Sequence, residues 1–312
     1  MTDKHPAGHS ALATAYILFG LNIPIMKSVL TDGHITSIDM AFFRFIGALA
    51  AFWLLSLFLP SEKVSRRDML LLFPASLTGL FINQFTFSFG LAITSPVDAA
   101  LINTVGPIMT MLLAALFLKE PITWLKAIGV LIGVGGALLL IFSNGIHSTE
   151  QSSSLPGNML ILTSTLSFVI YLTAFKPLIM RYSPVTLMKW MFLYATVCSL
   201  PFCLHRVIEI NFADISANIW LSTLYVVFIA TFLCYFLVPI GQKYLRPTIV
   251  SMYNYVQPVV SSLIAVIIGM DAFGWRKGIA TGLIFLGVYV VTQSKSRAHI
   301  EKSRAHIEAK KK

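Results

Sequence analysis

Two five-residue segments of the pattern Asn-x-Val-x-Pro carry polar groups suited to binding a ligand within a strongly apolar chain. They are Asn103–Pro107 and Asn254–Pro258, which lie 151 positions apart. The asparagine side chain both donates and accepts hydrogen bonds. A proline inside a helix leaves the carbonyl four residues earlier without its usual N–H partner, and here that carbonyl belongs to the asparagine. Each segment is therefore expected to be a kinked helix that binds polar substrate groups, or one whose asparagine bonds a neighbouring helix.

Uncharged polar and aromatic side chains occur in several other apolar segments. A few such polar groups within an aromatic wall are typical of a small-molecule pocket, and a buried tyrosine hydroxyl needs a partner. Tyr253 and Tyr255 cannot share one helix face. Simple packing is the competing interpretation for each aromatic residue. The candidate substrate-binding residues are Asn103, Asn254, Tyr253, Tyr255, Asn83, Gln84, Tyr235, Asn22, Tyr171 and Trp190, and the candidate helix-kink residues are Pro107, Pro258 and Pro24.

Arg44 is the one strong charge expected deep inside an apolar segment, about two turns from its outer end. Ionisable residues in such positions are functional candidates by default. Arg44 could bind a substrate carboxylate, or pair with Asp39 or Asp98 in an outer gate. It could instead extend to the interface or form a fixed structural ion pair. Asp98 could equally be an acid in the first turn of a helix capped by Ser95.

Other reactive patterns are missing from the sequence. No acidic residue falls at the middle of an apolar segment, so no carboxylate proton relay is evident. There is no GxxxxGK[ST] loop for nucleotide phosphates, and no HExxH motif or acidic cluster for a metal. We therefore expect no catalytic residue, no metal and no cofactor. Cys198, Cys203 and Cys234 form no CxxC pair and are expected to pack as small hydrophobic residues.

The chain that must position these residues is strongly apolar. Its 312 residues are 56% hydrophobic and 12% charged, and the mean hydropathy is +0.79. Soluble domains average about 25% charged residues, whereas about 20 consecutive apolar residues span a bilayer as a helix. The sequence predicts an all-α integral membrane protein of ten transmembrane helices, at residues 10–30, 39–59, 69–91, 96–118, 122–142, 157–179, 184–204, 217–239, 247–268 and 275–293.

The two halves of the chain repeat each other. A shift of 151 positions aligns a long stretch without gaps, and a shift of 149 aligns the first spans, with Lys27 on Lys176. Each half has five spans, an odd number, so the halves enter the membrane from opposite sides as inverted-topology repeats, which are common in secondary transporters. The expected organisation is a cytoplasmic N-terminus at 1–9, a first repeat at 10–143, an external linker at 144–156, a second repeat at 157–293 and a basic cytoplasmic tail at 294–312.

Basic residues between the spans indicate the orientation of the chain. Lysine and arginine in short loops favour the cytoplasmic side, and the loops opposite the termini hold only Arg206, Arg276 and Lys277. We expect a multi-pass protein of the cell (inner) membrane with both termini in the cytoplasm. Lys27 and Lys176 lie near helix ends and are expected to extend toward the interface. The tail, in which KSRAHIE occurs twice, could hold anionic lipids or act only as a topology signal.

Several short motifs in the chain are similar to those of a known protein family. They are Phe19-Gly20-x-Asn22-x-Pro24 with Lys27, Pro107 with the Leu118–Pro121 segment, and Trp124 with Gly129 and Gly133, echoed by Pro258, Gly269–Asp271 and Trp275. With them the sequence resembles the EamA-type transporters of the drug/metabolite transporter (DMT) superfamily, over nearly the whole chain except the tail. Phe19 stands where tryptophan is usual, and Asp271 where glutamate is typical. The resemblance implies a ten-helix inverted-repeat carrier with a central cavity that moves amino acids or similar metabolites, often outward.

These features predict a secondary exporter of small neutral or zwitterionic metabolites, with amino acids and their analogues first. It would work by alternating access around a cavity between the repeats. Asn103 and Asn254 would orient polar substrate groups, and Arg44 would meet a carboxylate or close the outer gate.

Two alternatives and the expected partners complete the prediction. An exchanger of phosphorylated sugars or nucleotide sugars should need more buried basic residues than this sequence offers. A membrane enzyme acting on lipid-linked substrates should need paired acids, a metal site or a nucleophile with its base. The expected partners are a small-molecule substrate and the lipid bilayer, and nothing but charge favours nucleic acid. Gly129-x-x-x-Gly133 and Gly278-x-x-x-Gly282 permit close helix contact within one chain or in a homodimer.

Overall fold

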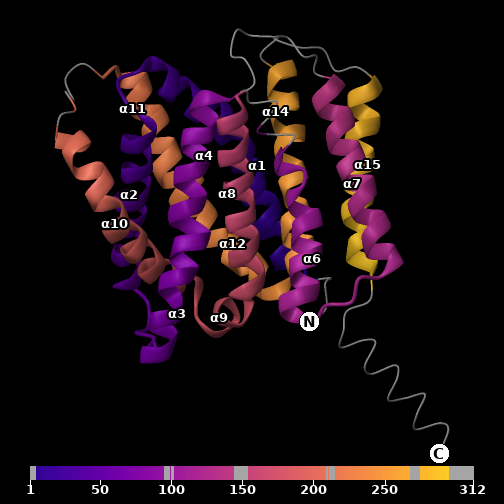
Figure 1. Ribbon diagram of the computed structural model, residues 1–312, viewed down its shortest axis with the longest axis horizontal. Helices are drawn as coiled ribbons and strands as arrows, with labels where there is room; N and C mark the ends of the chain where they lie inside the picture. Colours follow the sequence, from indigo (N-terminus) through magenta and orange to yellow (C-terminus); the bar gives the residue numbers. More distant parts are fainter. Residues whose placement is uncertain are drawn as a thin grey trace, which may run out of the picture.

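The computed structural model describes residues 5–94, 99, 102–143, 154–208, 210, 215–267 and 275–294, and within these ranges the chain is helical, with no β-strand (Figure 1). Asp98, most of the expected linker 144–156 and the tail after residue 294 lie outside the described residues. The elements are α1 (Pro6–Asp32), α2 (Ser37–Ser56), α3 (Arg66–Ser76), η1 (Leu77–Phe81), α4 (Ile82–Ile93), α6 (Gly106–Leu118), α7 (Trp124–Ser143), α8 (Leu155–Ala174), α9 (Lys176–Arg181), α10 (Pro184–Ile208), α11 (Ala217–Leu224), η3 (Tyr225–Leu233), α12 (Cys234–Tyr244), α13 (Pro247–Met252), η4 (Tyr253–Tyr255), α14 (Val256–Ile267) and α15 (Trp275–Gln293).

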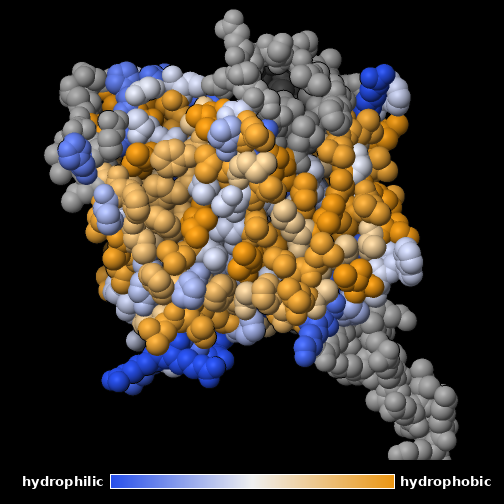
Figure 2. Space-filling view, viewed as in Figure 1, coloured by the Kyte–Doolittle hydropathy of each residue, from blue (hydrophilic) through white to orange (hydrophobic). Residues whose placement is uncertain are grey.

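Six of the described helical stretches are long and apolar enough to cross a membrane. They are α1, α2, the continuous stretches α3–η1–α4 and α11–η3–α12, α8, and residues Pro184–Cys203 of α10. Shorter apolar helices lie at Gly106–Leu118, Trp124–Leu139 and Gly278–Gln293. Hydrophobic residues cover most of the bundle face seen in Figure 2, and the strongly hydrophilic ones gather toward its two ends. The protein is therefore an all-helical, multi-pass membrane protein.

Polar caps fix where several helices begin. Thr36 and Asp39 form a capping box at the start of α2, in which the Asp39 carboxylate accepts a 2.9 Å hydrogen bond from the Thr36 N–H. The hydroxyls of Ser65, Ser154 and Ser216 cap α3, α8 and α11 in the same way, each accepting from a backbone N–H three residues later. The described hydrogen bonds of Asp39 thus go to its own cap, and the pairing with Arg44, one of the alternatives for that residue, is not formed.

The ninth expected span, 247–268, is not one continuous helix. It consists of α13, the 3₁₀ turn η4 and α14. In the first half the chain makes a turn at residues 104 and 105, and α6 begins directly after it. Pro107 therefore lies in the first turn of α6, where its missing N–H costs no helical hydrogen bond, rather than in mid-helix as expected. Pro258 is the third residue of α14, whereas Pro24 lies inside the continuous helix α1.

The irregular segments recur at equivalent positions of the two halves. The π-helical segment η1, residues 77–81, shifts by 151 to residues 228–232, which fall within the π-helical segment η3. The turn at residues 104 and 105 shifts to residues 255 and 256, where η4 meets α14. Short π segments within α-helices are frequent at functional sites. The sequence repeat is thus matched by a repeat of local backbone geometry.

Equivalent helices of the two halves also pack in reciprocal pairs. Helix α4 packs along α8 as α12 packs along α1, and α6 packs along α8 as α14 packs along α1. Helix α2 packs along α10, and α7 along α15 (Figure 1). The α7–α15 contact is close because glycines face it: a Cβ added to Gly287 would lie 2.6 Å from the nitrogen of Gly133. Gly129 also faces α15 of the same chain, whereas a Cβ on Gly282 would meet no atom within 4 Å.

Lys27 and Lys176 make equivalent hydrogen bonds in the two halves. Lys27 donates at 2.9 Å to the carbonyl of Leu91, in the last turn of α4. Lys176 donates at 2.9 Å to the carbonyl of Leu245, which caps the end of α12. A cation is favourable at a helix C-terminus, where carbonyl groups lack intrahelical partners. Instead of extending to the interface, both lysines therefore hold the C-terminal end of a helix.

Polar contacts join the α2–α3 connection and the first turn of α3 to the end of α9 and the α9–α10 connection. Arg181 donates to both carboxylate oxygens of Asp68, at 2.7 and 2.5 Å, and the Tyr182 hydroxyl donates to the same group at 2.6 Å. The Glu62 carboxylate accepts hydrogen bonds from the N–H and the hydroxyl of Ser183, at 2.9 and 2.8 Å. Burial alone would raise the pKa of Glu62, but the hydrogen bonds from Ser183 outweigh it and hold that pKa below its usual value.

The apolar core consists of two main clusters. One joins α1 to α12, α13, α14, α7 and α15, and the other joins α2, α3 and α10 to parts of α8 and α9. Phe19 of α1 and Phe168 of α8 pack against both clusters. The same two phenylalanines line a cavity.

Candidate functional site

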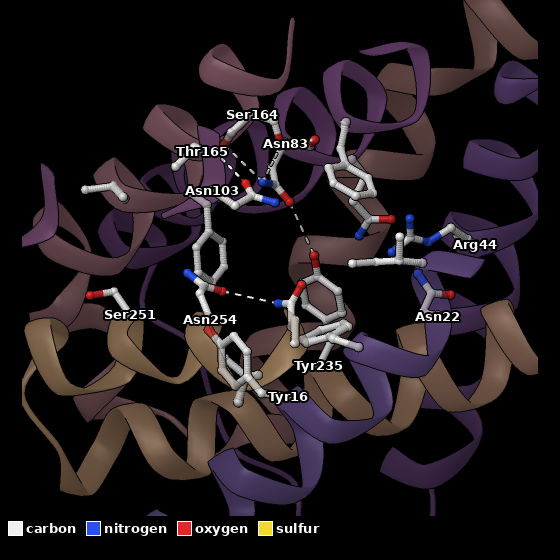
Figure 3. A pocket seen from close by; sticks show the side chains of 18 residues that line it. Tyr16, Asn22, Arg44, Asn83, Asn103, Ser164, Thr165, Tyr235, Ser251 and Asn254 are labelled. Atoms are coloured by element: carbon white, nitrogen blue, oxygen red, sulfur yellow. Dashed lines mark hydrogen bonds between the residues drawn. The ribbon is translucent and has the colours of Figure 1, made fainter. Parts of the chain in front are cut away.

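A cavity lies between the two halves of the chain and is enclosed by helices from both (Figure 3). Its wall mixes aromatic rings with uncharged polar side chains, and Arg44 is its one formally charged side chain among the described residues. The lining residues are Tyr16, Phe19, Asn22 and Ile23 of α1; Arg44 of α2; Asn83, Gln84 and Phe87 of α4; Asn103, which precedes α6; Ser164, Thr165, Phe168 and Val169 of α8; Tyr235 and Val238 of α12; Ser251 of α13; Asn254 of η4; and Gln257 of α14.

The cavity wall follows the internal repeat. With the shift of 149 for the first spans and 151 for the later ones, ten of the lining residues fall into five equivalent pairs. The unmatched polar residues are Asn22, Arg44 and Asn83 in the first half and Ser164, Ser251 and Gln257 in the second, and the charged one, Arg44, belongs to the first half. The equivalent pairs are Tyr16 and Thr165, Phe19 and Phe168, Gln84 and Tyr235, Phe87 and Val238, and Asn103 and Asn254.

The two asparagines of the Asn-x-Val-x-Pro segments meet at the cavity. Asn103 accepts a 2.9 Å hydrogen bond from the Thr165 hydroxyl, and Asn254 accepts one at 3.3 Å from the Gln257 amide. Gly106 lies beside Thr165 and Asn254, because a Cβ added there would be 3.4 Å from the Thr165 side chain and 3.6 Å from the amide nitrogen of Asn254. Both asparagine amide nitrogens lack a hydrogen-bond partner among the described residues. They are donors available to a ligand.

Asn83 holds a second part of the wall. Its amide donates to the carbonyl and the hydroxyl of Ser164, at 3.0 and 2.9 Å, and that hydroxyl donates to the Asn83 carbonyl at 2.8 Å. The Tyr235 hydroxyl points to the Asn83 side-chain oxygen, at 3.5 Å (Figure 3). These reciprocal bonds tie α4 to α8, so the Asn83 side chain is largely occupied by the protein itself.

Arg44 enters the cavity from α2 and is 4% exposed. Its Nε donates a 2.8 Å hydrogen bond to the hydroxyl of Thr231, which in turn donates at 2.7 Å to the carbonyl of Val226. Both of these residues belong to the π segment η3. The described residues place no carboxylate on the guanidinium, and Asp98 lies outside them.

Four further candidates lie away from the cavity. Tyr253 bonds His9 at 2.7 Å, and Tyr255 donates at 3.1 Å to the Thr104 carbonyl. Tyr171 donates at 3.3 Å to Gln242. Trp190 packs edge-on against Trp53. None of the four lines the cavity, so their described contacts are those of packing residues.

Sequence reasoning missed Tyr16 of α1 and the part of the wall that comes from α8. Tyr16, Ser164, Thr165 and Phe168 were not among the candidates, because hydroxyl and aromatic residues are ordinary in a membrane helix. The repeat contained a usable signal: the shift of 149 places Tyr16 on Thr165 and Phe19 on Phe168.

An all-helical membrane protein with a polar cavity between two halves is the arrangement of a carrier for small molecules. Comparison with known proteins agrees with this class. The model of the EamA-like transporter family matches residues 6–142 and again residues 155–293. The chain belongs to this family, whose members are transporters and not enzymes.

Similar proteins extend the comparison over most of the chain. The uncharacterized transporter YyaM of Bacillus subtilis is 24% identical, over 83% of this chain and 85% of its own length. A probable terminal-alkyne amino-acid exporter of Streptantibioticus cattleyicolor is 27% identical, over 43% of this chain and 44% of its own. A solved crystal structure matches with a TM-score of 0.71 at 19% identity, covering 91% of this chain and 96% of the other, which shows a shared fold.

Proposed function

We propose that this transporter is a secondary exporter of small neutral or zwitterionic metabolites such as amino acids and their analogues. The observation that carries the proposal is the cavity wall, where repeat-equivalent residues of the two halves face one space and Asn103 and Asn254 offer unpaired amide donors. Aromatic rings beside a few convergent polar groups suit a small molecule with one polar end.

The proposed architecture is a ten-helix bundle of two inverted five-helix repeats. The reciprocal packing of α4 on α8 and of α12 on α1 supports it, as do the equivalent irregular segments η1 and η3. In this arrangement the first half comprises α1, α2, α3–η1–α4, α6 and α7, and the second half comprises α8–α9, α10, α11–η3–α12, α13–η4–α14 and α15. Rocking of one half against the other would open the cavity alternately to the two sides of the membrane.

The character of the wall favours amino acids over phosphorylated compounds. A sugar phosphate carries about two negative charges, and its site should hold several cations. Among the described lining residues Arg44 is the one cation. The relative from Streptantibioticus cattleyicolor is named as an amino-acid exporter, which supports the same substrate class here. We place the protein in the cell membrane with both termini in the cytoplasm, because basic residues concentrate in the loops on that side. A homodimer is a separate proposal, which the molecular mass of the purified protein would test.

The experiment is transport by purified protein in liposomes, with a panel of the standard amino acids and with or without an imposed pH gradient. The test variant is Asn103→Ala/Asn254→Ala, and the control is Asn218→Ala, an exposed asparagine at the start of α11. We expect saturable flux of at least one panel member in the wild type and in the control, with strong loss in the double variant. Normal flux in the double variant would remove the asparagines from the substrate site, and absence of flux for every amino acid would refute the proposed substrate class.

A further inference from the structure

We infer that one end of the cavity binds the head group of an α-amino acid, with its carboxylate on Arg44 and its ammonium on the side-chain oxygens of Asn22 and Gln84. The inference rests on the proposed function and assigns the substrate groups within it. Figure 3 places Arg44 and Asn22 together on one side of the cavity, away from Asn103 and Thr165.

The guanidinium of Arg44 is fixed at one atom and open at the others. Its Nε is held by Thr231, and the Thr231 hydroxyl is fixed in turn by the carbonyl of Val226, five residues earlier in the π segment η3. The two Nη groups make no hydrogen bond to a described residue. A guanidinium in this state can donate two parallel hydrogen bonds to a carboxylate, which is its strongest form of pairing.

The charge of Arg44 needs a counterion that the described protein does not supply. The side chain is 4% exposed, and Asp39, the acid on the same helix, bonds Thr36 through one carboxylate oxygen while its other oxygen makes no hydrogen bond, so neither oxygen pairs with Arg44. A buried charge without a partner is costly, so an incoming carboxylate would be favoured at this position. One cation matches one carboxylate, and a neutral or cationic ligand would leave the charge uncompensated.

Gln84 and Asn22 present incompletely bonded polar atoms in the same wall. Gln84 is 1% exposed, and its side chain interacts with the Tyr235 hydroxyl, but neither amide atom has a partner at full hydrogen-bond geometry. The side-chain oxygen of Asn22, which is 5% exposed, has no hydrogen-bond partner. Nearly all buried polar groups in proteins are paired, so these incompletely bonded atoms in one wall suit the polar groups of a ligand. The Gln84 nitrogen can donate to a carboxylate, and the two oxygens can accept from an ammonium.

Helix register brings Gln84 to the level of Arg44. The Ser37 hydroxyl of α2 donates to the Ser88 carbonyl of α4, and farther along both helices the rings of Phe45 and Phe85 stack at 5.8 Å. The two helices are therefore antiparallel, and Phe45 lies against the turn between Phe81 and Phe85, because its ring stacks on both. Arg44 and Gln84 each precede the stacked ring by one residue, and on antiparallel helices this step turns both side chains toward the same side, which is the cavity.

The opposite end of the cavity suits the side chain of the substrate. It combines the rings of Tyr16 and Phe168 with the amides of Asn103 and Asn254, and none of these residues is charged. The substrate class is therefore free α-amino acids with uncharged side chains, and not the amines, amides or esters derived from them.

The test compares L-leucine, L-methionine and L-threonine with their carboxamides and with the amines that lack the carboxylate. Binding is measured as thermal stabilisation of the purified protein, and transport as counterflow in liposomes. We expect the amides and amines to act roughly 10- to 100-fold more weakly than the acids, the range of a lost charge-assisted pair. Arg44→Gln should abolish the preference for acids over amides and amines. The positioning variant Thr231→Val should raise the KM of the acids without changing their maximal rate, and it should leave the transport of the amides unaffected.

Thr292→Val is the matched control, because Thr292 makes a similar bond to a helix carbonyl, that of Val288, but lies on α15 outside the cavity wall. If acids and amides are transported equally by the wild type, the head-group site is wrong, but the proposal that the protein is a carrier is not affected. If Arg44→Gln does not fold, an unchanged KM in Thr231→Val overturns the assignment. If the protein carries other metabolites and none of the three amino acids, both the head-group site and the proposed substrate class are refuted.

Discussion

The hydroxyl of Tyr255 donates a 3.1 Å hydrogen bond to the carbonyl oxygen of Thr104, its own counterpart under the 151-position shift. Thr104 lies at the turn before α6, and Tyr255 ends the 3₁₀ turn before α14. The ring of Tyr255 also fills the space over Gly133 of α7, where an added Cβ would lie 2.7 Å from it. The two irregular segments beside the cavity are thus joined directly to each other.

Removal of this hydroxyl should loosen the junction. Tyr255→Phe keeps the packing of the ring and loses one buried hydrogen bond, which contributes about 0.5–1.5 kcal/mol. We expect a Tm in detergent lower by a few degrees and a reduced maximal transport rate. Tyr289→Phe is the control, because Tyr289 is 62% exposed and should tolerate the change. Equal behaviour of the two variants would mean that the Tyr255–Thr104 bond has no role in stability.

The paired lysines give a second prediction. Lys27→Met and Lys176→Met each remove a charged donor from a helix end, and a hydrogen bond from a charged group contributes about 1.5–3 kcal/mol. The loss should be larger for Lys176, which is 7% exposed, than for the partly buried Lys27. Thermal unfolding in detergent measures both, with Lys63→Met in an exposed connection as the control. A Tm unchanged in all three variants would contradict the helix-end role.

The α7–α15 contact gives a third prediction. Gly287→Ala would place its Cβ 2.6 Å from the nitrogen of Gly133 and 2.7 Å from the carbonyl of Gly129, so the helices must separate. Backbone cannot move aside cheaply, and overpacking of this kind costs about 1–3 kcal/mol. Gly282→Ala on the same helix meets no atom within 4 Å and should be neutral. Comparison of the two melting temperatures tests the contact, and a neutral Gly287→Ala would show that the two helices are not in close contact.

The contact of Glu62 with Ser183 should make stability depend on pH. The pKa of Glu62 is lowered in the folded protein because hydrogen bonds from Ser183 outweigh the effect of burial. A lowered pKa means that the stabilisation is present above the unfolded value, about 4.3 for glutamate, and is lost as the pH falls through the folded value. The Tm difference between wild type and Glu62→Gln should therefore stay nearly constant from pH 7 to about 5 and shrink as the pH falls below about 4.3 toward the folded pKa. A difference that stays constant well below about pH 4.3 would rule out the contact as its source.

The sequence predicted the helical membrane class and much of the cavity wall, for separable reasons. Hydropathy identifies apolar helices because the bilayer demands them. Polar residues inside such helices rarely face lipid, and seven of the candidates line the cavity: Asn22, Arg44, Asn83, Gln84, Asn103, Tyr235 and Asn254.

The rest of the cavity wall depends on which way each side chain points and on where a helix is interrupted, and hydropathy encodes neither. Tyr253 and Tyr255 flank Asn254 in the 3₁₀ turn η4 and bond His9 and the Thr104 carbonyl outside the cavity wall. Pro107 was expected in mid-helix, but the chain turns before it and the proline starts a helix instead. Thr165 gave no individual signal, because its hydroxyl also bonds the helix carbonyl of Ile161 in the manner of any threonine in a helix.

The measurement that tests the central claim most directly is substrate protection of a single cysteine in the cavity wall. Cys198, Cys203 and Cys234 would be replaced by alanine, and cysteine placed at Phe168, which lines the cavity, or at Leu166, which is 41% exposed on the outer face of the same helix. Both variants would be treated with a membrane-impermeant thiol reagent, with and without the amino acid of highest flux. A substrate-carrying cavity predicts that Phe168→Cys reacts and is protected by the amino acid, while Leu166→Cys stays unreactive in lipid. Phe168→Cys that never reacts from either side, or reacts equally fast at saturating substrate, would contradict it.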